Sequence, residues 1–455
     1  MSEEVVDVIV VGLGPGGEHV ATELARAGSS VLGVESRLVG GECPYFGCVP
    51  SKMMIRAADA LAEARRVGRL AGTVEVRPDW TPVFERIRDE ATDDWDDTVA
   101  VRRLEDAGAR FVRGRGRLVG PGRVEVAGAD GTTTSYVARV GVVLNTGTEP
   151  AVPPVEGLAA TPYWTNRDAV RQERLPASLA VMGGGAIGVE LAQAFARFGV
   201  EVTLVEMADR ILALEEPEAS AVVAQALAAD GIRIHAGVAV DSVEHSDGAF
   251  RLLVDGRTLV TERLLVAAGR RNNLADLGLE SVGLDPSARV VETDERMRAG
   301  ERLWAIGDIT GKGAFTHVSM YQAAVAVRDL LGSDGPWADY RAVSRVTFTD
   351  PEVGSVGLTE AQAREQGISV RTGTADVSAS SRGWIARADG VVKVVADADH
   401  NVLVGATAVG PAGGEVLGLL AGAVHARIPI DILRSMHFAY PTHHRAIETA
   451  LADLE

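Results

Sequence analysis

A pattern that occurs twice constrains the fold of this chain more than any other feature of its sequence. The first copy begins with an apolar strand and a glycine-rich run, VDVIVVGLGPGG, and a helical segment and a second strand follow. The second copy begins with LAVMGGGAIGVE and continues in the same order. In both copies the second strand ends in a glutamate that follows the first glycine by 23 residues (Gly12 to Glu35, and Gly183 to Glu206).

This order of strand, glycines, helix, strand and acid is typical of a dinucleotide-binding βαβ unit. The glycines let the backbone approach a pyrophosphate at the N-terminus of the helix, and the acid accepts hydrogen bonds from a ribose. One such motif is a weak signal, because glycines also occur in ordinary tight turns. Two copies at equal spacing predict two nucleotide sites, with Gly12, Gly14 and Gly17 in the first and Gly183, Gly185 and Gly188 in the second.

The rest of the chain predicts several domains, since 455 residues are too many for one hydrophobic core. Strand-like runs that end in small residues occur at 140–150, 263–273 and 302–310. Past about residue 340 the glycine motifs disappear, the run 391–410 predicts antiparallel strands, and 413–428 predicts a helix. We expect an α/β fold with two doubly wound dinucleotide-binding domains and a C-terminal α+β domain.

Charge and hydropathy exclude several classes of protein. A net charge of −18 argues against a nucleic-acid or anionic-membrane partner, which would require a basic surface. No run approaches the ~18 apolar residues of a membrane span. The first residues, MSEEVVDV, are acidic and lead directly into a strand, which predicts no secretory signal. We therefore expect a cytoplasmic protein whose two cysteines are either inert or chemically active.

The two cysteines lie close together in the run GGECPYFGCVPSK. An ideal helix would hold Cys43 and Cys48 too far apart for a disulfide, but a glycine and two prolines in this run can distort the backbone. Lys52, one of three lysines in the chain, and a helix N-terminus would both favour a thiolate. A redox pair is favoured over two inert buried cysteines, and over a metal site, for which no second Cys/His pair is evident.

GGECPYFGCVPSK resembles the active-site helix of the flavoprotein disulfide reductases, which include dihydrolipoamide dehydrogenase, glutathione reductase and mercuric reductase. The runs VMGGGAIGVE, AAGRRNN, AIGDIT, TFTDPEVGSVGLTE and YPT follow in the order of that family. The resemblance implies an FAD-binding domain over 1–150 and 273–338, an inserted NAD-binding domain over 151–272, and a C-terminal dimerisation domain over 339–455. It also implies a homodimer whose active site takes its last residues from the partner subunit.

The same resemblance implies roles for single residues. Cys48 would be the charge-transfer thiol beside the flavin, and Cys43 the interchange thiol that attacks the acceptor. Lys52, paired with Glu190, would lie at the reactive edge of the flavin. The residues implied for FAD are Gly12, Gly14, Gly17, Glu35, Ser36, Gly41, Lys52, Gly116, Thr146, Gly147, Asp308, Ala314 and His317, although His317 is equally compatible with a packing role. Those implied for NAD are Gly183, Gly185, Ile187, Gly188, Glu190, Glu206 and Gly269, and no metal site is expected.

These assignments predict an enzyme that passes electrons between a nicotinamide dinucleotide and a disulfide or dithiol substrate, through FAD and the cysteine pair. NADH is favoured over NADPH, because the carboxylate of Glu206 would repel a 2′-phosphate. Arg210, four residues further on, could partly compensate for that repulsion.

One segment departs from the family. Dihydrolipoamide dehydrogenases close with H-P-T-x-x-E, in which the histidine is the base and the glutamate orients it. Here Tyr440 and Arg445 stand at those two positions, and a phenol with a pKa near 10 is a poor base. His443 and Glu448 reproduce the His-to-Glu spacing three residues later, and His444 is adjacent. They are either a displaced base pair or histidines at a helix start. The resemblance also implies a cis peptide bond before Pro441.

Two further readings stay open. If the cysteines are secondary, the chain would be a flavin reductase of quinones or other small acceptors. If it has lost turnover, it would be a non-catalytic NADH or redox sensor.

Overall fold

The computed structural model describes residues 3–454. The chain forms two compact units, each of which is described by itself. Unit 1 contains the chain up to residue 50 together with 85–149 and 270–339, and unit 2 contains 51–84, 150–269 and the chain from 340 onward. These units follow internal contacts and do not test the division by cofactor, which stays a prediction.

Unit 1 is built on an eight-stranded sheet with the order β16-β17-β6-β1-β2-β3, to which β5 and β4 are added beside β6. The pairs β1–β2, β1–β6, β2–β3 and β6–β17 are parallel, whereas β4–β5, β5–β6 and β16–β17 are antiparallel. The strands are β1 Glu4–Val11, β2 Val31–Glu35, β3 Arg110–Arg113, β4 Arg115–Gly120, β5 Arg123–Ala127, β6 Thr133–Leu144, β16 Arg298–Gly300 and β17 Leu303–Ala305.

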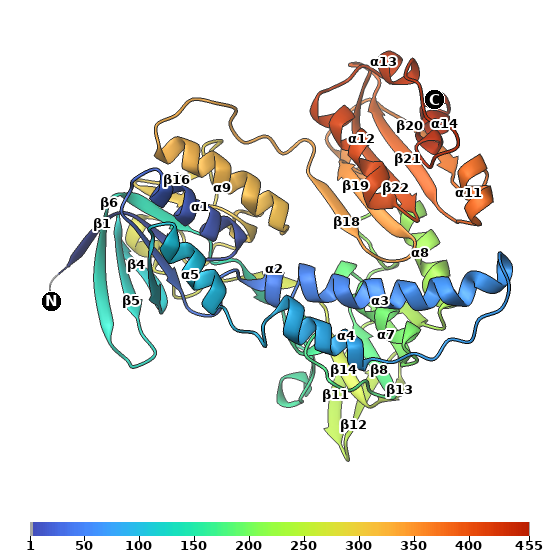
Figure 1. The fold of residues 1–455 in the computed structure, drawn as a ribbon, viewed down its shortest axis with the longest axis horizontal. Coiled ribbons are helices and arrows are strands. Elements are labelled where there is room, and N and C mark those ends of the chain that lie inside the picture. Colours follow the sequence, from blue (N-terminus) through green and yellow to red (C-terminus); the bar gives the residue numbers. More distant parts are fainter. Residues whose placement is uncertain (1–2, 455) are drawn as a thin grey trace. The chain divides into compact units, whose positions relative to one another are not determined.

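The apolar run predicted as the first strand forms β1, and most of its residues are buried, as expected for an inner parallel strand. The predicted helix after it forms α1, Pro15–Arg26, which packs against α9, Thr316–Leu330 (Figure 1). The other elements of this unit are α2 Glu42–Tyr45, the π-helix η2 Arg86–Ala91, α5 Thr98–Asp106, β7 Thr148–Pro150, β15 Arg270–Asn272, η4 Leu279–Val282 and η5 Asp308–Thr310.

Unit 2 contains the second copy of the repeat as a four-stranded parallel sheet with the order β10-β9-β8-β14. A three-stranded antiparallel sheet, β11-β12-β13, shares a hydrophobic core with it. The elements are β8 Ser178–Met182, α7 Ala186–Arg197, β9 Glu201–Glu206, α8 Pro217–Ala229, β10 Arg233–Ala236, β11 Val240–Ser246, β12 Ala249–Val254, β13 Arg257–Thr261, β14 Arg263–Val266, η3 Leu158–Ala160 and α6 Asn166–Ala169.

The C-terminal part of unit 2 is a five-stranded antiparallel sheet, β18-β19-β22-β21-β20, packed against α12 and α14. The strands predicted within 391–410 form the antiparallel pair β21–β22, and the helix predicted at 413–428 forms α12. The elements are β18 Ser344–Thr347, β19 Glu352–Gly357, α10 Glu360–Glu365, β20 Val370–Asp376, α11 Ser381–Ala386, β21 Val391–Asp397, β22 Val402–Gly410, α12 Gly413–His425, α13 Ile430–Arg434 and α14 Arg445–Ala452.

Helix α3, Cys48–Arg66, begins in unit 1 and continues in unit 2, where η1 Val67–Arg69 and α4 Thr81–Glu85 follow. Two doubly wound sheets and an antiparallel α+β part confirm the predicted fold class.

Candidate active site

The first glycine-rich turn, between β1 and α1, leaves no room for side chains. Gly12 has a φ of +93°, and a Cβ there would lie 2.3 Å from the backbone oxygen of Asn145. A Cβ on Gly17 would lie 2.0 Å from the oxygen of Gly12. Gly14 is the N-cap of α1 and supplies no side-chain cap. The first backbone N–H groups of α1 are therefore suited to bind an anion such as a pyrophosphate.

The second turn, between β8 and α7, repeats this geometry. Gly183 has a φ of +110°, and a Cβ there would lie 2.4 Å from the backbone oxygen of Ala267. A Cβ on Gly188 would lie 1.9 Å from the oxygen of Gly183. Gly185 is the N-cap of α7, and no described heavy atom lies within 4 Å of its Cβ position. Both turns therefore fit a dinucleotide pyrophosphate.

The acid that ends the second strand of each copy binds the backbone of its own turn. The Glu35 carboxylate accepts hydrogen bonds from the N–H of Leu13 at 2.8 Å and of Arg37 at 2.8 Å. Glu206 accepts from Gly184 at 2.5 Å and from Ala208 at 2.6 Å. A carboxylate has about four lone-pair sites, so each acid can also accept from a ribose.

Several residues implied for FAD cluster after β6 in unit 1. The Thr146 hydroxyl donates to the carbonyl of Asn273 at 2.8 Å, and Gly147 has a φ of +63°. Asp308 accepts a hydrogen bond from the Thr148 hydroxyl at 2.6 Å. The structure therefore places the end of β6 beside η5, with polar groups from both.

The remaining residues implied for FAD differ in exposure. Gly116 is buried in β4, where a Cβ would lie 2.9 Å from Val11, so its immediate role is close packing. Ser36, Ala314 and His317 are exposed, and the His317 ring stacks on Phe315 with centroids 5.3 Å apart. A Cβ on Gly41 would lie 2.9 Å from the Cα of Gly14, which brings the cysteine segment against the first turn.

Two residues at the first turn were missed from the sequence. The Asn145 amide donates to the carbonyl of Gly12 at 3.4 Å, and the Ser319 hydroxyl donates to the Asn145 side chain at 3.3 Å. A Cβ on Gly16 would lie 2.2 Å from the Ser319 oxygen. The position of Asn145 at a predicted strand end was visible, but its partner on α9 is distant in sequence.

The cysteine segment forms two helices with a break between them. Cys43 lies in α2 and is half-buried, and Cys48 is the exposed first residue of α3. At the break, the N–H groups of Phe46 and Gly47 both donate to the carbonyl of Glu42, at 2.8 and 2.7 Å. This confirms the predicted distortion of a continuous helix. The Cys48 sulfur lies 3.4 Å from the hydroxyl of Thr316.

Lys52 forms the predicted pair with Glu190. The lysine Nζ lies 2.8 Å from Glu190 Oε2, and the glutamate side chain is only 6% exposed. The other Glu190 oxygen accepts from the backbone N–H of Phe348 at 2.8 Å, and Nζ lies 4.7 Å from the Phe348 ring centroid. Lys52 follows Cys48 by four residues on α3, which is about one helical turn along the chain.

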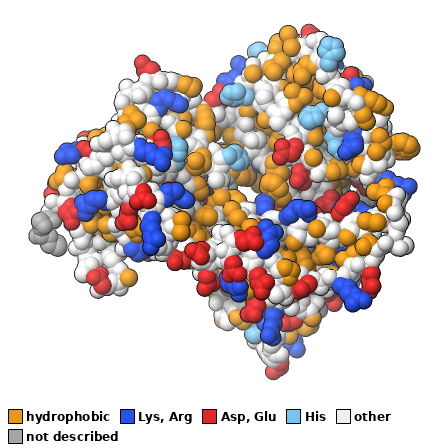
Figure 2. Space-filling view, viewed as in Figure 1, with side chains coloured by type: hydrophobic (Ala, Val, Ile, Leu, Met, Phe, Trp, Pro, Cys, Tyr) orange, Lys and Arg blue, Asp and Glu red, His pale blue; other side chains and the backbone are white. Residues whose placement is uncertain are grey.

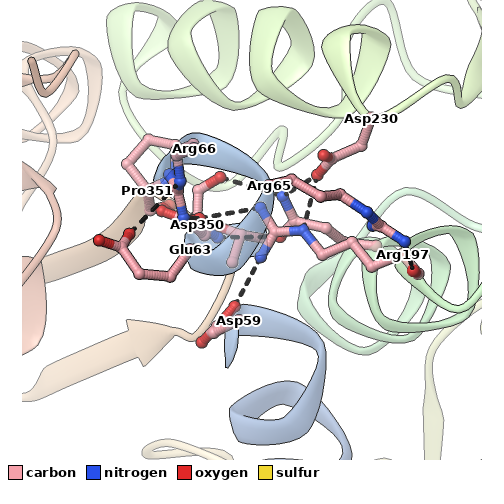
Figure 3. Close-up of polar contacts among 10 residues, drawn as sticks. Asp59, Glu63, Arg65, Arg66, Arg197, Asp230, Asp350 and Pro351 are labelled. Atoms are coloured by element: carbon pink, nitrogen blue, oxygen red, sulfur yellow. Dashed lines mark hydrogen bonds and ion pairs between the residues drawn. The ribbon is translucent and has the colours of Figure 1, made fainter. Parts of the chain in front are cut away.

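Glu190 belongs to a buried polar face of α7 that also contains Gln193 and Arg197. The Arg197 side chain is 4% exposed and binds three carboxylates, Asp59 of α3 at 2.6 Å and Asp230 and Asp350 at 2.9 Å each (Figure 3). Through these ion pairs, the buried polar face of α7 connects α3 to the segment that follows β18.

Further bonds close this network. Gln193 accepts from the N–H of Asp350 at 2.8 Å and donates to its carbonyl at 3.0 Å, and Arg66 of α3 donates to the Asp350 carboxylate at 2.6 Å. Burial raises the pKa of Asp59 to about 6, although Arg197 opposes the shift. Burial also acts to raise the pKa of Asp350, but Arg66 and Arg197 outweigh it and hold that pKa below its usual value.

The segment in which the sequence departs from the family lies before α14. The Tyr440–Pro441 bond is cis, as the resemblance implied. Tyr440 is 70% exposed, and its hydroxyl donates to Ser381 at 3.2 Å. The Arg445 guanidinium lies 5.5 Å from the Tyr440 ring centroid and 2.9 Å from Glu448. Tyrosine and arginine are thus in contact at the two positions where dihydrolipoamide dehydrogenases have a histidine and a glutamate.

The proposed displaced pair of His443 and Glu448 does not form. Glu448 pairs with Arg445, and the buried Nδ1 of His443 has no hydrogen-bond partner among the described residues. His443 instead lines a small apolar cavity with residues of β21, β22 and α12. Burial, followed by the charges of Arg382 and His444, lowers the pKa of His443. The pair was suggested only by the five-residue His-to-Glu spacing of the family motif, and the structure instead places the half-buried ring against an apolar cavity.

Arg210, considered as a counterion for a 2′-phosphate, binds its own loop. It donates to the carbonyls of Ala213 and Glu215 at 2.9 and 3.0 Å. Of the other residues implied for NAD, Ile187 is half-buried in the first turn of α7, and Gly269 has a φ of +110° with no described atom within 4 Å of its Cβ position.

The C-terminal part of unit 2 exposes hydrophobic side chains (Figure 2). They include Trp384 at 76%, Ile385 at 49%, Ile432 at 56% and Met436 at 38% exposure. Within residues 3–454 no three His, Cys, Asp or Glu side chains are grouped so as to hold a metal ion. No described helix is both long and apolar enough to span a membrane.

The chain is similar to known proteins over nearly its whole length. A family model described as pyridine nucleotide-disulphide oxidoreductase matches residues 6–328, and the model of that family's dimerisation domain matches 343–451. Dihydrolipoyl dehydrogenase of Halobacterium salinarum is 34% identical over 96% of this chain and 93% of its own length. Mercuric reductase of Streptomyces lividans is 32% identical over 98% and 95%.

Solved structures agree with this assignment. LpdA of Mycobacterium tuberculosis matches with a TM-score of 0.86 and 27% identity over 98% of this chain and 99% of its own. The Cu(II) complex of RclA from Escherichia coli, a HOCl-induced flavoprotein disulfide reductase, matches with a TM-score of 0.86 and 26% identity over 99% of both chains. The chain therefore belongs to the pyridine nucleotide-disulphide oxidoreductase family, whose members are flavoenzymes that use FAD and a pyridine nucleotide.

Proposed function

We propose that this enzyme passes electrons between NADH and a disulfide or dithiol substrate through FAD and a redox-active Cys43–Cys48 pair. The observation that carries the proposal is the cysteine segment itself. It breaks between α2 and α3, so Cys48 begins a 19-residue helix on which Lys52, paired with buried Glu190, follows one turn later. The helix N-terminus and the ammonium group both favour a thiolate at Cys48.

The first glycine-rich turn, with Glu35, is the proposed site of the ADP half of FAD. Thr146, Gly147 and Asp308 are proposed to hold the rest of the cofactor. Bound FAD would supply the hydride and two-electron chemistry that links the nicotinamide to the cysteine pair. The protein supplies the binding groups and sets the acidity of the thiols.

The second turn is the proposed site of the nicotinamide dinucleotide, and the charges there favour NADH. Glu206 places a carboxylate at the ribose end of β9, where a 2′-phosphate would be repelled. Arg210 is engaged by two carbonyls of its own loop, so it is poorly placed to offset that repulsion. A KM for NADPH more than tenfold above that for NADH would support this assignment, and equal values would contradict it.

The thiol chemistry requires only residues of this chain and the substrate. In the reduced pair, the Cys43 thiolate attacks a sulfur of the substrate disulfide and forms a mixed disulfide, releasing one substrate thiolate. Cys48 then attacks the Cys43 sulfur, which releases the second substrate thiolate and regenerates the Cys43–Cys48 disulfide. The two thiol protons pass to the released substrate thiolates, and the reverse sequence oxidises a dithiol.

The substrate is proposed to differ from dihydrolipoamide. Tyr440 donates a hydrogen bond to Ser381 and is in contact with Arg445, so this segment offers a phenol and a cation rather than an imidazole base. We propose that the enzyme is a homodimer formed through its C-terminal domain, and that this segment contributes to acceptor recognition across the dimer.

An anaerobic titration with NADH tests the proposal. The wild-type enzyme should develop a long-wavelength thiolate–flavin charge-transfer band that disappears in Cys48→Ser and persists in Cys43→Ser. No such band in the wild type would reject the proposed role of the pair. Side-by-side assays of the reduced enzyme with thiol disulfides and quinones would then identify the class of acceptor.

A second candidate is a reductase of quinones or similar small acceptors, in which electrons leave the flavin directly. The Tyr440–Arg445 contact, which lacks the usual base, favours it. For this function, Cys43→Ser should retain nearly all quinone turnover. A large loss of that turnover would reject the second candidate.

A further inference from the structure

Three consecutive residues in unit 1 adopt a backbone conformation that L-amino acids rarely adopt. Asp93, Asp94 and Trp95 have φ angles of +48°, +54° and +59°. Aspartate tolerates the left-handed region better than most residues, but tryptophan does not. The three residues directly follow the π-helix η2, itself a rare element. Such strain persists only where surrounding contacts fix the backbone, and it is concentrated at functional sites.

The strained turn is closed by its own hydrogen bonds. Thr92, 1% exposed, donates to the carbonyl of Ile87 through both its N–H, at 3.1 Å, and its hydroxyl, at 3.0 Å. The N–H of Asp94 donates to the carbonyl of Arg88 at 2.7 Å, and that of Asp96 to the carbonyl of Thr92 at 3.2 Å. These bonds hold residues 92–97, here called the brace, in one conformation.

The brace holds the cysteine segment on both sides of Cys43. The Trp95 indole N–H donates to the carbonyl of Tyr45, the last residue of α2, at 3.0 Å. The Asp97 carboxylate, in a residue 7% exposed, accepts from the N–H of Val39 at 2.6 Å. Two side chains from one strained turn therefore bind the backbone before and after Cys43.

The Asp97 carboxylate is fixed by an ion pair. Arg113 of β3 donates to both oxygens of the Asp97 carboxylate, at 2.8 and 2.6 Å. The Tyr45 side chain is also buried, and burial, followed by the charges of Asp97 and Glu18, raises the pKa of its phenol to about 12. The Asp97–Val39 bond is therefore buried and the Trp95–Tyr45 bond is partly buried, so both are harder to exchange for bonds to water than surface bonds are.

Helix α2 needs such support. It is a single four-residue turn, too short to be stable alone, and its last carbonyls have no partner within the helix. Trp95 supplies the partner for one of them. Without the brace, the backbone that presents Cys43 would depend on Gly40 and Gly41, both of which have positive φ angles and few rotational restraints.

We propose that Trp95 and Asp97 are positioning residues that hold Cys43 in the geometry required for exchange with Cys48. The proposal rests on the proposed function of the two cysteines as a redox pair. By limiting the motion of α2, the brace raises the effective concentration of one sulfur beside the other and so favours the disulfide over the dithiol.

The test is the equilibrium of the holoenzyme with mixtures of reduced and oxidised dithiothreitol. Reduced dithiothreitol gives two electrons and two protons to the protein disulfide and becomes the cyclic disulfide, so the ratio fixes the equilibrium constant. The dithiol and disulfide forms are then trapped by alkylation and counted by mass spectrometry. Trp95→Phe keeps the ring but removes the N–H donor, and it should shift the equilibrium about tenfold towards the dithiol, or about 30 mV.

The chain offers a matched control. The Trp80 indole N–H also donates to a backbone carbonyl, that of Gln172 at 2.7 Å, in unit 2. Trp80→Phe therefore removes the same kind of bond from a carbonyl that is not part of the cysteine segment, and it should leave the equilibrium within twofold of the wild type. Asp97→Asn, which weakens the other anchor, should shift it in the same direction as Trp95→Phe.

The outcomes separate this inference from the proposed function. If the wild type forms the Cys43–Cys48 disulfide but neither Trp95→Phe nor Asp97→Asn shifts its equilibrium, the brace does not position Cys43 and the function stands. An equal shift in Trp80→Phe would also overturn the inference, because a general loosening of the fold would then explain the effect. If the wild-type cysteines form no disulfide at any ratio, the proposed function fails.

Discussion

The two glycine-rich turns share one backbone geometry but differ in their surroundings. In the first, a Cβ on Gly14 would lie 3.3 Å from Asn145, and one on Gly16 would lie 2.2 Å from Ser319. In the second, the Cβ position of Gly185 has no described atom within 4 Å. The first turn is enclosed by other elements and the second is open. We propose that the enclosed turn holds the cofactor that stays bound and that the open turn holds the coenzyme that exchanges at each turnover.

The helices that follow the turns differ in the same way. Arg26 of α1 and Arg197 of α7 both follow the first glycine of their copy by 14 residues. Arg26 is 62% exposed and pairs with Glu23 on the same helix, whereas Arg197 is 4% exposed and binds three carboxylates. The repeated motif therefore determines the geometry of the glycine-rich turn. The residues further along the helix that follows can make different contacts in the two copies.

The largest expected effect is the loss of stability when the buried arginine, Arg197, is replaced, compared with replacement of the exposed arginine, Arg26. Arg197→Gln would leave Asp59, Asp230 and Asp350 without their shared cation, and removing one partner of a buried ion pair costs ~3–5 kcal/mol. Arg26→Gln removes an exposed pair, worth ~0–1 kcal/mol. Urea unfolding of both variants measures the difference. Equal midpoints would show that the buried network adds no stability.

The next effect separates the two turns by their ligands. Gly17→Ala and Gly188→Ala each place a Cβ against a backbone oxygen, and overpacking of this kind costs ~1–3 kcal/mol, or about 5- to 150-fold in affinity. Gly17→Ala should be purified with less bound flavin per chain. Gly188→Ala should retain its flavin but show a higher KM for NADH. Flavin loss in both variants would contradict the assignment of the turns.

A smaller effect concerns the open turn alone. Gly185→Ala meets no described protein atom, so its thermal midpoint should match the wild type. The methyl group would, however, stand where a pyrophosphate approaches the helix. Loss of one hydrogen bond to a charged group costs ~1.5 kcal/mol, so the KM for NADH should rise about tenfold. An unchanged KM would place the coenzyme elsewhere.

The last expected effect depends on pH. The pKa of Asp59 is raised to about 6 in the folded protein, against about 3.9 in the unfolded chain. The folded state therefore binds the proton more tightly, so ionised Asp59 lowers stability above pH 6 and has no such cost below about pH 4. Asp59→Asn should be more stable than the wild type above pH 6, and this gain should vanish near pH 4. Thermal melts across that range measure it; a gain independent of pH would have another cause.

The elements that the sequence predicted well are those with a local signal. Strand, glycines and helix follow from residue types within a few positions, and so did the break between Cys43 and Cys48. The Lys52–Glu190 contact came from the family resemblance, since those residues are far apart in the chain. Each of these features could therefore be predicted either from the types of neighbouring residues or from the pattern of a known family.

What could not be predicted depends on long-range packing. Polar residues at helical spacing, such as Gln193 and Arg197, ordinarily indicate a solvated face, and only the fold reveals that three carboxylates surround them. Trp95 lies in an acidic run that indicates an exposed loop. Its left-handed backbone conformation could not be predicted, because the usual indication of that conformation is a glycine and the run contains none. The His443–Glu448 pair, one of two alternatives that the sequence left open, does not form, because the spacing of a motif does not show which partner Glu448 takes; in the structure it is Arg445.

The hydrogen bonds of Glu206 also bear on engineering the coenzyme preference. Because its two carboxylate oxygens accept from the N–H groups of Gly184 and Ala208, the side chain is part of the turn as well as a candidate ribose ligand. A neutral apolar residue there would remove the repulsion of a 2′-phosphate. It would also leave the N–H groups of Gly184 and Ala208 without their acceptor. A redesign for NADPH must therefore supply both a cation for the phosphate and an acceptor for the freed amides, so the switch requires a set of coordinated substitutions.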